Sequence, residues 1–243
     1  MRSAVIAMFA ALACRASIDE MTEVYYSGPG RRVLCSTAID SNKADMASIL
    51  RGLQRASRDG TILQLYAHDP RSTITPARIE GILKAARDLG LATFTYRQLA
   101  EGIPASPGIA LSFDDWSIDG WYDLAELFER YDAHVTFFVA RYRGAKPERR
   151  GKLQELYRRG HDVEAHSMDH AHAPIDTPAN VERYVAEQVE PSLAVLREDG
   201  FTPRVYAYPF GEHFDALDRA VLEHVDVVRT TAYAIDRSSD GCR

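Results

Sequence analysis

Short runs of apolar and β-branched residues alternate along this chain with longer stretches whose apolar residues recur at helical spacing. The short runs predict eight strands, at residues 32–37, 61–67, 92–96, 109–113, 134–139, 161–165, 204–208 and 226–230. The longer stretches predict six helices, at residues 44–58, 75–89, 121–131, 148–159, 178–198 and 214–223. Pro191 is expected to kink or split the fifth helix. Four helices are followed by a glycine that suits a C-terminal cap: Gly60, Gly90, Gly160 and Gly200. This alternation predicts an α/β fold with a parallel sheet covered by helices, and about eight strands predict a closed or nearly closed barrel.

Polar or conformationally special residues follow four of the predicted strands. Asp114 and Asp115 follow one strand, and His166, His68 and the segment 209–211 follow three others. The carboxyl ends of parallel barrel strands share one rim, where the reactive residues of such barrels lie. We therefore expect these residues to form one site.

The spacing of two histidines and the pair of acids favour a metal site. His166 and His170 are four residues apart, so a helical turn would place both on one face. Two imidazoles with the Asp115 carboxylate would leave positions open for water and substrate. Asp114 could then act as general base toward a water. Without a metal, the histidines would be solvated loop residues and the acids a helix cap or part of a solvated loop.

Three motifs in order resemble a known family. They are Ser112-Phe113-Asp114-Asp115, then His166-Ser167-x-x-His170, then Tyr208-Pro209-Phe210-Gly211. Together they resemble the polysaccharide deacetylases of the NodB-homology type, carbohydrate esterase family 4. The resemblance implies a distorted (β/α) barrel and a divalent metal, usually zinc and sometimes cobalt or nickel. It also implies that Asp114 is the base, that Asp115, His166 and His170 hold the metal, and that the segment Tyr208-Pro209-Phe210 contacts substrate, with the backbone N–H of Tyr208 at the oxyanion.

The family's second acid, a histidine, usually lies on a late strand, but few residues follow Gly211 here. Residues 60–69 look like that late strand displaced to the front, and residues 75–99 look like the family's closing segment. This order resembles that of the poly-N-acetylglucosamine deacetylases and implies a circularly permuted arrangement with His68 as general acid. The alternative is a loop histidine beside Asp69-Pro70.

Several positions depart from the family pattern. Trp116 replaces a glycine, where it would narrow the site or stack on a sugar ring, and Ala207 replaces an arginine that orients the base. Asp40 and Asp45 are the nearest candidates for a further acidic motif. Four aromatic residues are candidates for lining a sugar-binding groove: Trp116, Trp121, Tyr142 and Tyr208.

Composition narrows the classes of partner. The formal net charge is −6 over 243 residues, and this negative charge argues against binding to nucleic acid or anionic lipid. No stretch is long enough to span a membrane. The three cysteines, Cys14, Cys35 and Cys242, contain no CxxC pair, which disfavours a thiolate zinc site. Their odd number argues against a disulfide framework, although one disulfide remains open.

The N-terminus has features of a signal segment. Arg2 precedes an apolar run over residues 4–13 that ends in a small-residue pattern, and Cys14 follows as a candidate for lipid modification. The alternative is a buried helix start. We expect an N-terminal extension over residues 1–30 and the barrel over residues 31–243. By analogy with the family, an extracytoplasmic location is favoured over a cytoplasmic one.

Taken together, the sequence predicts a metal-dependent hydrolase that removes acetyl groups from a carbohydrate, most directly N-acetyl groups of an amino-sugar polymer or oligomer. Such an enzyme cleaves a non-peptide C–N bond. Three alternatives stay open: an O-acetyl glycan esterase, a cyclic amide hydrolase and an inactive carbohydrate-binding module.

Overall fold

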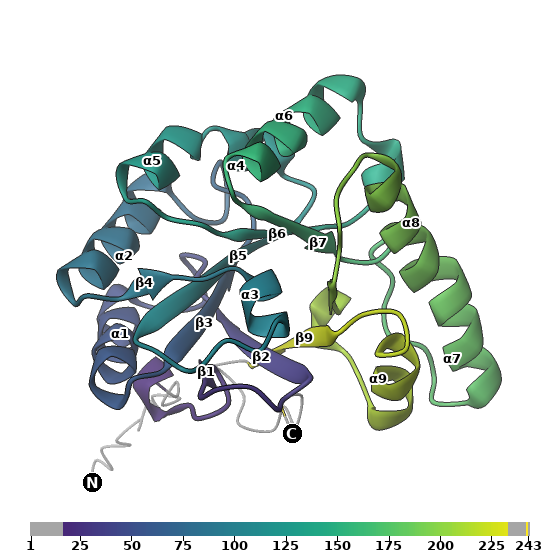
Figure 1. Ribbon diagram of the computed structural model, residues 1–243, viewed down its shortest axis with the longest axis horizontal. Helices are drawn as coiled ribbons and strands as arrows, with labels where there is room; N and C mark the ends of the chain where they lie inside the picture. The colour runs from purple at the N-terminus through teal and green to yellow at the C-terminus, as the bar shows by residue number, and fades with distance from the viewer. Residues whose placement is uncertain (1–16, 233–241, 243) are drawn as a thin grey trace, which may run out of the picture.

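The computed structural model describes residues 17–232 and 242 (Figure 1). Its strands are β1 (Tyr25–Tyr26), β2 (Val33–Ala38), β3 (Ile62–Ala67), β4 (Ala92–Thr93), β5 (Gly108–Asp115), β6 (Thr136–Val139), β7 (Asp162–Ala165), β8 (Val205–Ala207) and β9 (Val227–Ala232). Its α-helices are α1 (Met46–Asp59), α2 (Pro76–Asp88), α3 (Tyr96–Ala100), α4 (Ile118–Tyr122), α5 (Ala125–Arg130), α6 (Pro147–Arg158), α7 (Pro178–Tyr184), α8 (Glu190–Glu198) and α9 (Asp215–Val221).

Seven parallel strands close into a barrel in the order β3-β2-β9-β8-β7-β6-β5, and β5 pairs again with β3. The closing pair runs in register from Ile62 opposite Gly108 to Ala67 opposite Phe113. The predicted α/β barrel is confirmed. The run at residues 92–96 is the exception, because β4 covers only its first two residues and pairs outside the closed ring. It stops early because the Thr95 side chain accepts a hydrogen bond from the Gln98 N–H and thereby caps α3.

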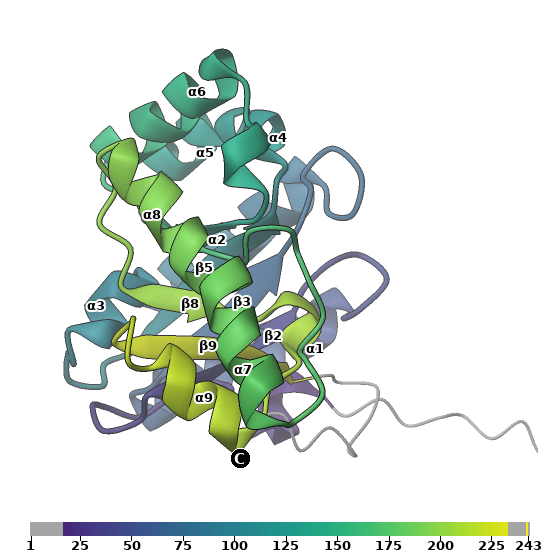
Figure 2. The ribbon, with the colours of Figure 1, turned by 90° about the vertical axis from the view of Figure 1, so that its right-hand side faces the viewer.

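The helices surround the barrel, with α1 and α2 on one side, α4–α6 on another and α7–α9 on a third (Figure 1). The predicted helix over residues 178–198 is continuous but irregular. A π-helical segment, Val185–Val189, joins α7 to α8 and ends two residues before Pro191. Proline lacks an N–H and its ring crowds the carbonyl four residues earlier, so a local widening of the helix accommodates it. Figure 2 shows α7 and α8 as one long rod along the side of the barrel.

The barrel interior has its own apolar cluster, to which six strands contribute Leu34, Ile62, Ala110, Phe138, Val205 and Val227. Tyr96 and Leu99 of α3 pack into this cluster. The backbone N–H of Tyr96 donates to the Thr136 hydroxyl at the start of β6, so α3 plugs the amino end of the barrel. The rim at the opposite, carboxyl end carries the functional residues described below.

Residues 17–30 are part of the folded domain. Ile18 is fully buried, its N–H donates to the Ser48 hydroxyl of α1, and β1 pairs antiparallel with β3. The domain therefore begins earlier than the boundary expected at residue 31. The predicted signal segment and Cys14 lie outside the described residues.

A disulfide joins Cys35 of β2 to Cys242 near the C-terminus. It crosses 207 residues of sequence and so connects the first barrel strand to the chain beyond the last one. The pairing could not be read from the sequence, where the cysteines stand far apart.

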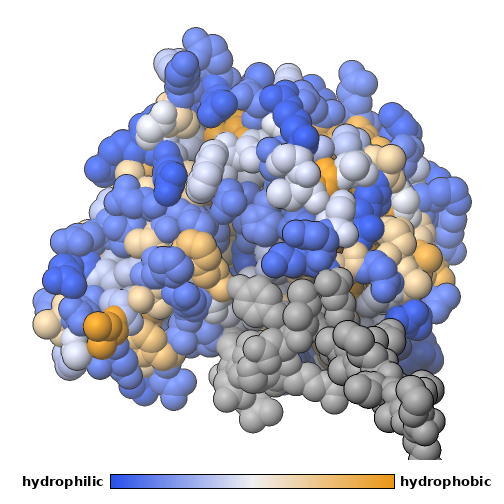
Figure 3. Space-filling model, turned by 180° about the vertical axis from the view of Figure 1, so that it is seen from behind, coloured by the Kyte–Doolittle hydropathy of each residue, from blue (hydrophilic) through white to orange (hydrophobic). Residues whose placement is uncertain are grey.

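The face seen from behind in Figure 3 is mainly hydrophilic, with small and separate hydrophobic patches. Among the described residues, no helix has the length and apolar character needed to cross a membrane.

Candidate active site

The carboxyl ends of β3, β5, β7, β8 and β9 surround a cavity of about 210 Å³. All five residues that were expected to hold the metal or to transfer protons line it: His68, Asp114, Asp115, His166 and His170. They come from three strands or the loops that follow them, as expected for a rim of parallel strands.

Asp115, His166 and His170 form the group of described residues that is suited to hold a metal ion, with one donor atom of each lying within 4.8 Å of the others. The Asp115 Oδ1 atom lies 3.0 Å from His170 Nε2 and 3.6 Å from His166 Nε2. Burial alone would raise the pKa of Asp115, but hydrogen bonds to the two histidines hold it well below its ordinary value. Two imidazoles and a carboxylate are a donor set that suits zinc and similar divalent ions.

The environment of His166 fixes which ring nitrogen faces this group. Its Nδ1 atom lies 2.9 Å from the Ala207 carbonyl oxygen. A carbonyl only accepts hydrogen bonds, so Nδ1 carries a proton and Nε2 is the ring nitrogen that faces Asp115 and is available to a metal ion. A carbonyl partner on the second ring nitrogen is common for a histidine that binds a metal.

The two histidines do not lie on a helix, so the predicted helical turn is wrong. Residues 166–177 form a loop, in which Ser167 and His170 have φ of 72° and 58°. Asp115 also has positive φ, at 84°. Non-glycine residues adopt this conformation rarely and at a cost, and such strain gathers at functional sites. The loop brings the His166 and His170 ring centroids within 5.0 Å.

Asp114 is buried and pairs with an arginine that the sequence analysis missed. Arg229 of β9, which is fully buried, places Nη2 2.5 Å from Asp114 Oδ2. The other carboxylate oxygen, Oδ1, is buried and has no hydrogen-bond partner among the described residues. Ala207, where an arginine was expected, lies directly opposite Arg229 in the β8–β9 pair. The orienting arginine is therefore present, one strand further along.

His68 lies at the end of β3 and is held from two sides. Its Nδ1 atom lies 2.5 Å from Asp40 Oδ2, and its carbonyl accepts a hydrogen bond of 2.9 Å from the Trp121 indole N–H. Although burial opposes the charged form, the hydrogen bond to Asp40 and the charges of Asp114 and Asp115 raise the pKa of His68 to about 9. For Asp40 itself burial acts in the opposite direction, but the hydrogen bond from His68 lowers its pKa.

The candidate acids Asp40 and Asp45 thus have different positions. Asp40 supports His68, whereas the Asp45 side chain accepts a hydrogen bond from the Ser48 N–H and caps α1. Asp45 has no part in the cavity.

The segment from Tyr208 to Gly211 borders the cavity, but one predicted role is wrong. The Tyr208 N–H donates to the Arg229 carbonyl in the strand ladder, at 3.0 Å, so it is not available to an oxyanion. Pro209 is buried, while Phe210 has φ of 60° and is 42% exposed beside the His170 ring. Phe210 therefore remains a candidate for substrate contact.

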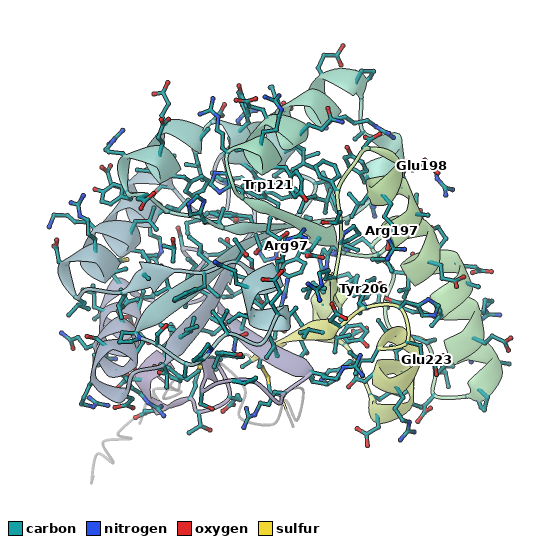
Figure 4. The ribbon with its side chains drawn as sticks, viewed as in Figure 1. Arg97, Trp121, Arg197, Glu198, Tyr206 and Glu223 are labelled. Atoms are coloured by element: carbon teal, nitrogen blue, oxygen red, sulfur yellow. A yellow bond between two sulfur atoms is a disulfide. The ribbon has the colours of Figure 1, made fainter. Side chains whose placement is uncertain are left out.

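Of the four aromatic candidates for a sugar-binding groove, only Trp116 is exposed, at 41%. Trp121 lies between the helices and the barrel, stacked on Phe137, where no sugar reaches it (Figure 4). Tyr142 and Tyr208 are also buried, and the Tyr142 hydroxyl donates to Asp199. Trp116 stands edge-on to His170, with ring centroids 5.7 Å apart.

Residues 102–227, more than half of the chain, match the polysaccharide deacetylase family. Three solved structures illustrate the likeness. The Streptococcus pyogenes deacetylase PplD in complex with acetate has 17% identity over 71% of this chain and 92% of its own, with a TM-score of 0.55. IcaB from Ammonifex degensii has 18% identity over 72% and 86%, with a TM-score of 0.57. The BpsB deacetylase domain from Bordetella bronchiseptica has 15% identity over 70% and 94%, with a TM-score of 0.54.

At these identities the structural likeness concerns the fold. No significant match to a curated protein was found. The family match falls on the segment that carries Asp114, Asp115, His166 and His170. The chain belongs to the polysaccharide deacetylase family.

Proposed function

We propose that this chain is a metal-dependent hydrolase that removes acetyl groups from a carbohydrate, and that it acts on N-acetyl groups of an amino-sugar polymer or oligomer. One observation carries the proposal. A single cavity holds the group formed by Asp115, His166 and His170, an unpaired carboxylate oxygen of Asp114, and His68 supported by Asp40.

Asp115, His166 and His170 would hold the ion, for which zinc is our first choice and cobalt or nickel the alternatives. The donor set and the protonation of His166 at Nδ1 support this assignment. When bound, a divalent cation supplies Lewis-acid polarisation of the acetyl carbonyl.

The remaining residues divide the proton transfers between them. Asp114 Oδ1 takes a proton from the attacking water, while Arg229 holds Oδ2 and so fixes the orientation of the carboxylate. The water oxygen bonds to the acetyl carbon and the C–N bond breaks. His68, protonated and positioned by Asp40, gives its proton to the departing nitrogen. The products are acetate and the free amine.

An extracytoplasmic location forms part of the proposal. The disulfide between Cys35 and Cys242 supports it, because disulfides persist in oxidising compartments. The substrates proposed here are also found outside the cytoplasm.

Acetate release from N-acetylglucosamine oligomers tests the proposal, with purified protein assayed in zinc and in chelator. We expect release that requires the metal and is abolished in Asp114→Asn, with a loss of at least about a hundredfold. Asp123→Asn is the matched control, since Asp123 is a surface residue paired with Arg71. Acetate from O-acetylated xylan alone would favour an esterase. Cleavage of a cyclic amide alone would change the reaction, and sugar binding without hydrolysis would indicate a binding module.

A further inference from the structure

A second cavity lies beside the site, on the far side of Trp116. Its volume is about 260 Å³, and its lining includes Trp116, Arg141 and Tyr142. Trp116 connects the two cavities, because it lines the second one and stands edge-on to His170, which lines the catalytic cavity. A ligand in this second cavity would lie next to a sugar whose acetyl group is in the first.

Arg141 is fixed to both segments that carry the metal-site residues. It follows Ala140, whose N–H donates to the Asp115 carbonyl at 2.7 Å. Its own N–H donates to the Ser167 carbonyl at 3.4 Å, and its Nε donates to the Asp169 carbonyl at 3.2 Å. These contacts hold its backbone at φ of 55°, a left-handed conformation that is unfavourable for arginine.

The guanidinium group lies on the Trp116 ring, with its central carbon 4.5 Å from the ring centroid. This stacking sets the plane of the group without using the hydrogen-bonding capacity of its terminal nitrogens. Among the described residues, Arg141 has no carboxylate within ion-pair distance and its two Nη atoms make no hydrogen bond.

The neighbouring charges do not compensate Arg141. Arg149, which also lines the cavity, pairs with Asp119, and Asp119 in turn also pairs with Lys152. The Asp169 carboxylate accepts a hydrogen bond from the Gln188 amide instead. Lys43 lines the catalytic cavity itself and likewise has no ion pair within the described part of the chain. An acidic chain thus places two uncompensated cations beside its site.

From this arrangement we infer that Arg141, held on Trp116, binds an anionic group on the sugar next to the acetylated one, so that the preferred substrate is an acidic N-acetylated glycan. The planar guanidinium offers two parallel N–H groups, which suit a carboxylate or a phosphate. The inference rests on the proposed function, which supplies the acetylated sugar. It adds that the neighbouring sugar carries a negative charge.

The test compares three probes: a neutral N-acetylglucosamine tetramer, a hyaluronan tetrasaccharide that carries carboxylates, and an N-acetylglucosamine dimer that carries a phosphomonoester. The variants are Arg141→Gln and, as the matched control, Arg143→Gln. Arg143 is exposed two residues away and does not line the cavity. We expect wild type to prefer an acidic probe. Arg141→Gln should lower the ratio of acidic to neutral kcat/KM by about tenfold or more, and Arg143→Gln should leave it unchanged.

Which acidic probe loses more in Arg141→Gln distinguishes carboxylate from phosphate. Equal rates on neutral and acidic probes in wild type, or equal effects of the two variants, would overturn the inference while leaving acetate release intact.

A binding measurement separates this inference from the proposed hydrolysis. The chain has two tryptophans, and Trp121 is buried, so a change in tryptophan fluorescence on adding a probe reports on the exposed Trp116. Suppose that no probe releases acetate. A fluorescence change with acidic probes that depends on Arg141 would then support the anionic subsite and refute the proposed hydrolysis. No change would refute both.

Discussion

Replacing Arg229 by methionine removes the cation that lies against Asp114 in the barrel interior. Both partners are buried, and their closest atoms are 2.5 Å apart. The methionine would keep much of the side-chain volume but leave the carboxylate buried without a cation. The guanidinium also lies over the rings of Phe138 and Tyr66, at 4.7 Å and 5.2 Å from their centroids, so those contacts are lost as well.

Breaking a buried ion pair by removing one partner costs about 3–5 kcal/mol of folding free energy. For a chain of this length, each kcal/mol lowers the melting temperature by about 2–4 °C. The expected loss in Arg229→Met is therefore roughly 6–20 °C. Activity should fall too, since the orientation of Asp114 depends on the same contact.

Thermal melts and denaturant titrations of a double-mutant cycle measure this effect. The cycle comprises wild type, Arg229→Met, Asp114→Asn and the double variant. Because the uncompensated charge causes most of the loss, the double variant should be more stable than the sum of the single effects predicts, by at least about 1 kcal/mol. Arg219→Met, on the exposed surface of α9, is the control for the substitution itself. A loss under about 1 kcal/mol in Arg229→Met, or strict additivity in the cycle, would refute the reasoning.

Three further predictions concern the site. In Asp40→Asn, the basic limb of the pH–rate profile should move to lower pH by about one unit or more. A general acid must keep its proton, and the hydrogen bond to Asp40 is what chiefly raises the pKa of His68. An unmoved limb would contradict this role of Asp40. Asp115→Ala should weaken zinc binding, measured by calorimetry, by at least about a hundredfold. It should also abolish the rise in melting temperature that zinc gives the wild type. An unchanged affinity would place the metal elsewhere. Gly211→Ala should destabilise the fold by about 1–3 kcal/mol in denaturant titrations, since φ is 72° and the added methyl would overlap the Thr231 hydroxyl; wild-type stability would show that the turn relaxes freely.

Much of the fold was predictable because periodicity and capping residues agree along the chain. The strands of the barrel and the large helices lie within a few residues of their predicted positions, and all four capping glycines have positive φ. The disagreement at residues 92–96 has a local cause. Thr95 followed by Gln98 forms a capping box, and this helix signal outweighs the β-branched and aromatic residues around it.

The site was less predictable, because loop conformation depends on contacts distant in sequence. Four-residue spacing suggested a helical turn for His166 and His170, but the actual loop follows strained backbone at Ser167 and His170. The Ser167 hydroxyl donates to Gln188, twenty-one residues later, so the partner that holds the loop lies on another element. No local pattern could have revealed this contact.

Arg229 was missed by comparison with the family motif, although the alternation of side chains along β9 places it inside the barrel. Ala207 stands where the family pattern has an arginine that orients the base. Side chains alternate across a strand, so Val227, Arg229 and Thr231 share a face, and Val227 belongs to the interior cluster. That alternation alone places Arg229 inside the barrel, and a buried arginine requires a carboxylate partner.

Asp114 shares the inward face of β5 with Ala110 and Ser112, and the Ala207–Arg229 pair lies in register on the opposite side of the barrel. The Asp114 carboxylate requires one cation in the barrel interior, and this cation can come from either of the adjacent strands β8 and β9. The absence of an arginine at position 207 is therefore not evidence that the catalytic base has lost its orienting partner.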